Sequence, residues 1–208
     1  MNKFFKLTLL GAALLAVSPA SAQVNTVTSP GLTTGYLPRN TYSAGFIGLV
    51  PAASTTDLLC IAGSAAKTVK LQNIKISGSG TAISIPATLV RRVSADTGGT
   101  AASTTANPAN NISKRDPANP AAVATVIAYT ANPTIVDTAP TYIDSANVGV
   151  VATTVGVVNP VNVFDYAKDV ENFLQPPTLR AASDQLCVNL NGTSATALLS
   201  GTITWTEE

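Results

Sequence analysis

Short runs in which apolar and polar residues alternate recur along this 208-residue chain, and Gly, Pro and Asn separate them. In the run KTVKLQNIKISGSG (residues 67–80), Val69 and Leu71 are predicted to point inward, the alternation slips at Gln72-Asn73, and Ile74 and Ile76 resume it. One extra residue within an alternating run is typical of a β-bulge. Alternation with a period of two favours strands over helices, so this feature constrains the fold more than any other.

Further strands are predicted in TAISIPATLVRRV (81–93), AAVATVIAYTANP (121–133) and the closing SATALLSGTITWTEE (194–208). Pro86, in the first of these, favours an edge strand or a kink. Alternation in the second places four residues on one face: Val123, Thr125, Ile127 and Tyr129. Charged residues make up only 11% of the chain. We therefore expect an all-β fold, a single-domain antiparallel β-sandwich that is jelly-roll-like and carries an extended N-terminal arm.

Two stretches lack this alternation. QVNTVTSPGLTTGYLPRN (23–40) is too polar for a core strand and predicts an extended arm, and residues 96–120 predict a long exposed loop rich in small polar residues and proline. The expected organisation is therefore a signal peptide at 1–22, the arm at 23–42 and the β-sandwich domain at 43–208.

The first residues resemble a secretory signal. Lys3 and Lys6 form a basic region, Leu7–Val17 is apolar, and Ala20-Ser21-Ala22 fits a cleavage site before Gln23. The alternative is a retained anchor, but the apolar run is shorter than the ~20 residues of a membrane-spanning helix. We expect export to the periplasm, the cell surface or the extracellular medium, with no membrane insertion after cleavage.

The charge balance excludes one class of partner. The net charge is +1, and removal of the signal lysines Lys3 and Lys6 changes it to −1. A nucleic-acid-binding protein normally presents a basic face, whereas the basic residues here are scattered, with Arg91-Arg92 and Lys114-Arg115 as the adjacent pairs. We therefore expect no nucleic acid as a partner.

Two cysteines, Cys60 and Cys187, lie in the strand-like segments TDLLCIAG and SDQLCVNLNG. In an exported protein they suggest a disulfide, which would close a loop of roughly 127 residues. Two buried free thiols are the alternative. The sequence leaves both states open because it does not show whether the two strands are neighbours.

The chain contains no histidine, which excludes Ser-His-Asp and Cys-His catalytic arrangements. Two cysteines without histidine also make a poor zinc site. A Ser-Lys pair at Ser113-Lys114 lies in the predicted loop, where no apolar surroundings would lower the pKa of the lysine. We therefore predict no catalytic, metal or cofactor site, and a protein that is not an enzyme.

The densest acidic group is FDYAKDVENF, which contains Asp165, Asp169 and Glu171. The preferred interpretation is a solvated turn, with Lys168 as the local counter-charge. A calcium site is an alternative, although the spacing matches no EF-hand loop. A glycosidase carboxylate pair is another, but a sugar cleft usually presents stacking aromatics, and the one tryptophan, Trp205, lies in the terminal strand.

Two adjacent arginines followed by two glycines invite an anion-binding interpretation. On a strand, however, Arg91 and Arg92 point to opposite faces and cannot clamp one anion together. Asp96 and Gly98-Gly99 then predict a turn rather than a phosphate cradle, because no helix follows.

Two glycosylation-type triplets are interpreted as turns. They are Asn111-Ile112-Ser113 and Asn191-Gly192-Thr193. The pair Asn191-Gly192 is in addition a hairpin signal between two strands.

Five phrases in fixed order carry a resemblance to a known group of proteins. They are DLLCIAGSAAKTVKLQNIKISGSGTA, LVRRVSADTGGT, DPANPAAVATVIAYTANPT, LRAASDQLCVNLNG and the ending ITWTEE. The chain from about Asp57 to Glu208 resembles a family of small phage and prophage proteins that are assumed to be virion structural components. The resemblance implies a β-rich domain that self-assembles or decorates a larger particle, and it supplies no catalytic residues. The signal and the arm lie outside it and suggest a related domain redirected to an exported assembly.

We expect an exported, non-enzymatic structural subunit that forms a homo-oligomer, a filament or a particle-surface layer. The alternative is a cell-surface or secreted module that binds a glycan or a protein through loops at one end of the sandwich, with tyrosines supplying contacts. Its candidate contacts are Tyr36, Tyr42, Tyr129, Tyr142 and Tyr166. A secreted hydrolase on a β scaffold is the third hypothesis.

Overall fold

The computed structural model describes residues 39–98, 101–103, 112–129, 131–152, 161–167, 174–193 and 196–208, with backbone alone at 101–103. The predicted signal peptide and residues 23–38 of the predicted arm lie outside these ranges. In the ranges that are described, no helix is long and apolar enough to cross a membrane.

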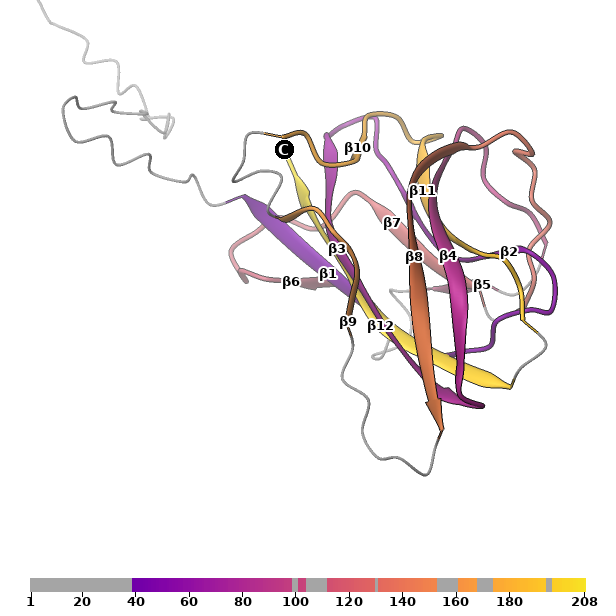
Figure 1. Cartoon of the computed structure of the whole chain (residues 1–208). Coiled ribbons are helices and arrows are strands. Elements are labelled where there is room, and N and C mark those ends of the chain that lie inside the picture. The colour runs from indigo at the N-terminus through magenta and orange to yellow at the C-terminus, as the bar shows by residue number, and fades with distance from the viewer. Residues whose placement is uncertain are drawn as a thin grey trace, which may run out of the picture. The chain divides into compact units, whose positions relative to one another are not determined.

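β-strands dominate the described residues (Figure 1). In chain order they are β1 (Asn40–Leu49), β2 (Thr56–Ala62), β3 (Val69–Gly80), β4 (Ile83–Arg92), β5 (Ala101–Ser103), β6 (Ile112–Lys114), β7 (Thr125–Tyr129), β8 (Thr141–Ala152), β9 (Val161–Asp165), β10 (Thr178–Leu179), β11 (Gln185–Leu190) and β12 (Ala197–Glu207). The all-β class predicted from alternation is confirmed.

These strands form one 12-stranded sheet with the order β5-β7-β2-β11-β4-β8-β3-β12-β1-β6, and β9 and β10 pair with β3. The sheet is curled into a half-barrel. A short parallel pairing of Gly78–Gly80 with Val150–Ala152 connects its two halves into one sheet. Every other strand pairing among the described residues is antiparallel.

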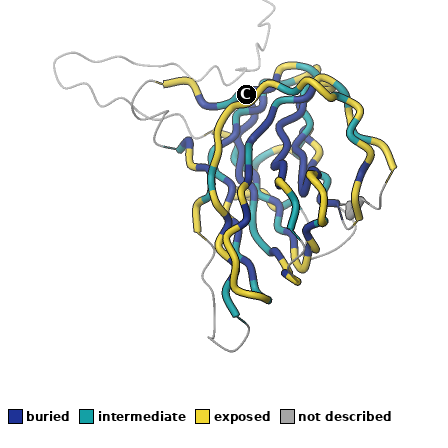
Figure 2. The backbone as a smooth tube through the Cα atoms, turned by 45° about the vertical axis from the view of Figure 1, so that its right-hand side comes forward, coloured by how far each residue is buried: buried dark blue, intermediate teal, exposed yellow. Residues whose placement is uncertain are grey.

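Buried residues lie along strands of both halves of the sheet (Figure 2), and the larger of the two buried apolar clusters in the described residues draws on both halves. The predicted bulge in β3 is confirmed. Asn73 is opposite Thr204 and Leu71 is opposite Trp205, so Gln72 is the extra residue. The bulge restores the alternation, and the apolar residues Leu71 and Ile74 on either side of it are both buried.

Two expected segments differ from the structure, the arm and the long loop. Tyr42, placed at the end of the arm, lies in β1 and is fully buried, because Tyr42, Ala44 and Phe46 alternate inward. The predicted loop at 96–120 contains the short strands β5 and β6, whose pairing with β7 and β1 the local composition did not indicate. The remainder of that loop at 99–100 and 104–111 lies outside the described residues.

Pro86 and Gly192 lie in surroundings that differ from those predicted. Pro86 does not lie on an edge strand, since β4 pairs with both β11 and β8. It lies one residue beyond the last β11 register pair, Leu190 with Ala87, and its carbonyl oxygen accepts a hydrogen bond from the N–H of Asn191 at 3.2 Å. Gly192 has the positive φ of +86° that a turn requires, but the predicted hairpin is wrong, because β11 and β12 lie in different halves of the sheet.

Candidate functional site

Strand β11 is buried on both of its faces. Leu186, Val188 and Leu190 point into the main core, whereas the alternate residues Cys187 and Asn189 point to the opposite face and are also buried. Neighbouring strands contribute to this second buried layer, which we call the outer cluster: Asp57 and Cys60 of β2, Val90 and Arg92 of β4, Tyr129 of β7, and Cys187 and Asn189 of β11. The face of the sheet that carries the outer cluster is covered by loop residues, including Asp137.

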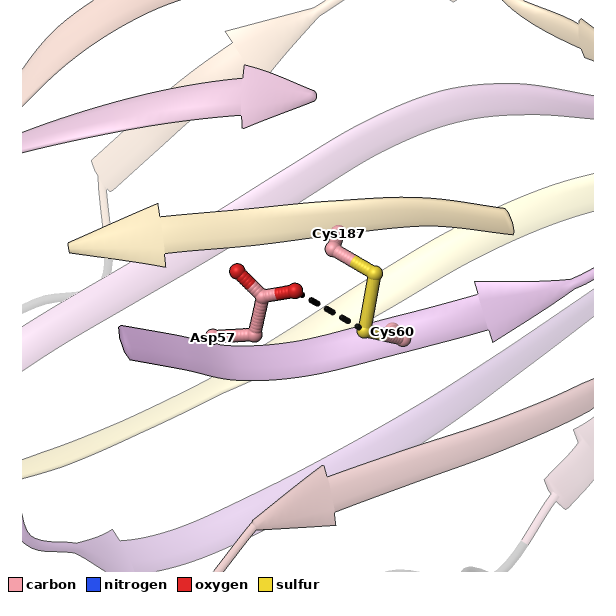
Figure 3. A group of neighbouring side chains, drawn as sticks. All are labelled: Asp57, Cys60 and Cys187. Atoms are coloured by element: carbon pink, nitrogen blue, oxygen red, sulfur yellow. Dashed lines mark hydrogen bonds between the residues drawn. A yellow bond between two sulfur atoms is a disulfide. The ribbon is translucent and has the colours of Figure 1, made fainter. Parts of the chain in front are cut away.

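A bulge in β2 places a carboxylate in the outer cluster. The register passes from Leu59 opposite Val188 to Asp57 opposite Asn189, so Leu58 is the extra residue. Because the bulge reverses the alternation, Asp57 shares the face of Cys60, and Leu58 joins the main core instead. The side chains of Asp57 and Cys60 accordingly point the same way in Figure 3.

The two cysteines are directly opposite each other on neighbouring antiparallel strands, with Cα atoms 4.1 Å apart. This separation is typical of the narrow, non-hydrogen-bonded pair in an antiparallel ladder. Their Sγ atoms are joined in a disulfide with an S–S distance of 2.11 Å and a sequence separation of 127 residues. Of the two states that the sequence left open, the structure has the bonded one.

A buried ion pair lies beside the disulfide. Arg92 donates from Nε to Asp57 Oδ2 at 2.5 Å and from Nη2 to Asp57 Oδ1 at 2.9 Å. The amide of Asn189 donates to the same Oδ1 at 2.6 Å. The side chains of Arg92 and Asp57 are 2% and 0% exposed, so each charge has been removed from water and depends on the other.

The third guanidinium nitrogen of Arg92 connects the Arg92–Asp57 ion pair to the loop that contains Asp137. Nη1 donates to the carbonyl oxygen of Asp137 at 2.5 Å, and the backbone N–H of Val93 donates to Asp137 Oδ2 at 3.0 Å. The N–H of Val93, followed by that of Ala139 and the charge of Arg92, lowers the pKa of the Asp137 carboxyl. Two segments form this cover, residues 93–98 after β4 and residues 131–140 before β8. Backbone hydrogen bonds between Thr97 and Thr134 join them to each other.

A second carboxyl group, that of Asp96, enters the cluster from this cover. Both of its oxygens are shielded from water. Burial, followed by the neighbouring Asp57 carboxylate, raises the pKa of Asp96 to about 7, although Arg92 opposes the shift. Burial, followed by the charges of Asp96 and Asp57, raises the pKa of Tyr129 to about 12. The cluster therefore holds one carboxylate matched by Arg92 and a second carboxyl that retains its proton up to neutral pH.

Asp57, Cys60 and Cys187 offer three metal-type ligand atoms within 4.8 Å of one another (Figure 3). Two observations argue against a cation there. The sulfurs are bonded to each other and are not the thiolates that bind metals, and the carboxylate is already neutralised by Arg92. Cys60 Sγ lies 3.8 Å from Asp57 Oδ2, a contact without a proton to share because a bonded sulfur carries no hydrogen. The arrangement cross-links β2 to β11 and places a neutralised carboxylate beside the disulfide.

The two arginines have separate partners, as the alternation predicted. Arg92 points to Asp57, whereas Arg91 donates from Nη2 to the carbonyl oxygen of Thr178 at 2.8 Å and lies 3.7 Å from Asp184. They do not clamp one anion. Gly98 in the following turn has a φ of +73°, and Gly99 lies outside the described residues.

The other predicted candidates do not form a site in the described residues. Asp165 ends β9, is exposed, and accepts hydrogen bonds from Asn162 and Ala167, whereas Lys168, Asp169 and Glu171 lie outside the described ranges. Ser113 and Lys114 lie exposed on β6 rather than in a loop.

Among the tyrosines, one alone is exposed in the described part of the chain. Tyr42, Tyr129 and Tyr166 are buried, Tyr142 is 71% exposed, and Tyr36 lies outside the described residues.

A second buried polar group, the carboxylate of Glu207 at the end of β12, was not predicted from the sequence. Trp205 stacks on Tyr42 with ring centroids 5.9 Å apart and donates from Nε1 to Glu207 Oε1 at 3.1 Å. Glu207, 1% exposed, also accepts the backbone N–H groups of Val123 and Ala124 at 3.0 Å. The ending WTEE therefore holds the segment before β7 against β12. Trp205 and Glu207 are two residues apart on a predicted strand and so share a face, and this spacing could have indicated that Glu207 is buried beside Trp205.

No family model matches this chain, and no curated protein or solved structure is similar to it. The resemblance to phage structural proteins therefore stays a prediction based on the quoted phrases.

Proposed function

We propose that this chain is an exported, non-enzymatic structural subunit that assembles with copies of itself. The observation that supports this most directly is the first half of β8, where Thr141–Ser145 are exposed on both faces of the strand. Tyr142 and Ile143 are 71% and 36% exposed there. Exposed apolar residues on a strand of this kind suit contact with another protein surface.

The polar chemistry of the described residues supports the same proposal. Asp57 and Arg92 are sealed below a cover and hold it in place, and Glu207 holds a neighbouring segment of backbone. These groups would make the subunit rigid and leave no reactive group open to a substrate. A disulfide is compatible with an oxidising compartment, which favours export.

The binding-module alternative receives less support. It relied on exposed tyrosines, and three of the four that are described lie in the interior.

The test is the mass of the exported protein in solution, measured by light scattering over a range of concentrations, with electron microscopy of the same sample. Defined oligomers or filaments are expected. Tyr142→Lys should lower the mass by placing a charge on the exposed strand, whereas Val50→Lys, at a residue 57% exposed elsewhere, is the matched control and should not. A monomer at every concentration would contradict the proposal.

A further inference from the structure

One edge of β8 has no partner over most of its length in the described sheet. On one side β8 pairs with β4 from Thr141 to Val150. On the other side its pairing, with β3, is confined to Val150–Ala152. No described strand forms a ladder with Thr141–Gly149 on that side, where the Tyr166 side chain, just after β9, reaches Asp144. Among the described residues, the backbone donors and acceptors along this edge therefore have no strand partner.

Two of the usual devices that protect an edge are limited here, although β8 has a bulge at Ile143 in its ladder with β4. Natural sheets protect open edges with charges, proline or a bulge directed away from the sheet. The segment TYIDSANVG (141–149) contains no proline and one charged residue, Asp144. Asp144 accepts a hydrogen bond from the hydroxyl of Tyr166 at 2.9 Å. Because the segment has no proline, its backbone retains the N–H groups that an added strand would use, apart from that of Ser145, which donates to Asp144 Oδ1 at 2.7 Å.

We infer that residues 24–29 (VNTVTS) of a neighbouring copy add a strand to this edge. The inference rests on the proposed self-assembly and names its contact. Val and Thr favour strands, Pro30 ends the run, and no residue from 23 to 38 is charged, so nothing there would repel Asp144.

The length of the chain before β1 permits this contact. The described part begins at Arg39, whose side chain is 37% exposed, and β1 begins at Asn40. Residues 23–38 would span up to about 50 Å when extended, at about 3.3 Å per residue. A folded unit of this size has a radius of gyration of about 15 Å, so the segment can reach a neighbouring copy. Added main-chain hydrogen bonds would supply the affinity, and Tyr142 and Ile143 would supply apolar contacts.

The experiment combines light scattering with hydrogen exchange, on the protein obtained by expressing the full chain with its export signal. Three samples are compared: the full protein, a variant lacking residues 23–38, and that variant with a synthetic peptide of residues 23–38. A peptide carrying Val27→Pro is the matched control, because proline removes an N–H from the added strand. β11 (Gln185–Leu190), paired on both edges, serves as the internal reference.

We expect the full protein to assemble and the shortened variant to be monomeric. In the variant, amide exchange at 141–149 should accelerate about tenfold or more while the β11 amides are unchanged. The wild-type peptide should restore the slow exchange, and the Val27→Pro peptide should not.

Other results would overturn the inference in distinguishable ways. If the shortened variant assembles as the full protein does, with equal exchange at 141–149, the strand addition is wrong and self-assembly stands. If the full protein is monomeric at every concentration, the inference and the proposed function both fail.

Discussion

The buried ion pair makes the sharpest prediction about stability. Asp57→Ala removes the carboxylate that accepts two hydrogen bonds from Arg92 and one from Asn189. The guanidinium would then remain buried with the carbonyl oxygen of Asp137 as its described partner. Loss of one member of a buried pair costs about 3–5 kcal/mol, so we expect Asp57→Ala to lower the free energy of unfolding by that amount.

A double-mutant cycle separates this interaction from general disruption. Arg92→Met alone should also cost about 3–5 kcal/mol, since Asp57 is then the uncompensated charge. The double variant should cost at least about 2 kcal/mol less than the sum of the two single changes, because neither charge is left alone. The assay is urea unfolding of each protein at pH 7 with the disulfide intact.

The neighbouring arginine provides the control. Arg91 is 28% exposed and lies 3.7 Å from Asp184, so Arg91→Met should cost less than about 1 kcal/mol. Additive effects of Asp57→Ala and Arg92→Met would refute the reasoning. So would an Arg91→Met cost as large as that of Arg92→Met.

Three further predictions concern the disulfide, the second carboxyl and a turn. Replacing Cys60 and Cys187 together by alanine should lower the free energy of unfolding by about 4 kcal/mol in urea, because it frees a long loop in the unfolded chain; an unchanged midpoint would contradict this. The pKa of Asp96 is raised from 3.8 to about 7, so its contribution to stability is complete below pH 3.8 and is lost as the pH rises through 7. That loss is at most about 4 kcal/mol, and Asp96→Asn should therefore flatten the decline in unfolding free energy between pH 4 and 7; an equal slope in both proteins would show that Asp96 does not cause it. Gly192→Ala should lower the melting temperature, because the φ of Gly192 is +86° and a Cβ there would lie 2.6 Å from the carbonyl oxygen of Ala53. Gly149→Ala is the control and should have a smaller effect, because a Cβ at Gly149 would have no heavy atom within 4 Å.

The features that were predictable from the sequence are those with a local cause. Alternation placed a bulge at Gln72-Asn73, where the register identifies Gln72 as the extra residue, and it placed Arg91 and Arg92 on opposite faces. Successive side chains of a strand point to opposite sides wherever the strand lies. Positive φ at Gly192 was likewise predictable, since few other residues tolerate it.

The features that the sequence did not determine depend on which strands become neighbours. Asn191-Gly192 has turn chemistry, but the turn joins the two halves of the sheet instead of closing a hairpin. Asp57 meets Arg92 and Asn189 across separations of 35 and 132 residues, and the bulge at Leu58 decides that Asp57 faces them. Backbone alternation repeats every two residues and can be read locally, whereas strand pairing is settled by how the whole chain buries its core, so the tertiary structure alone brings these polar groups together.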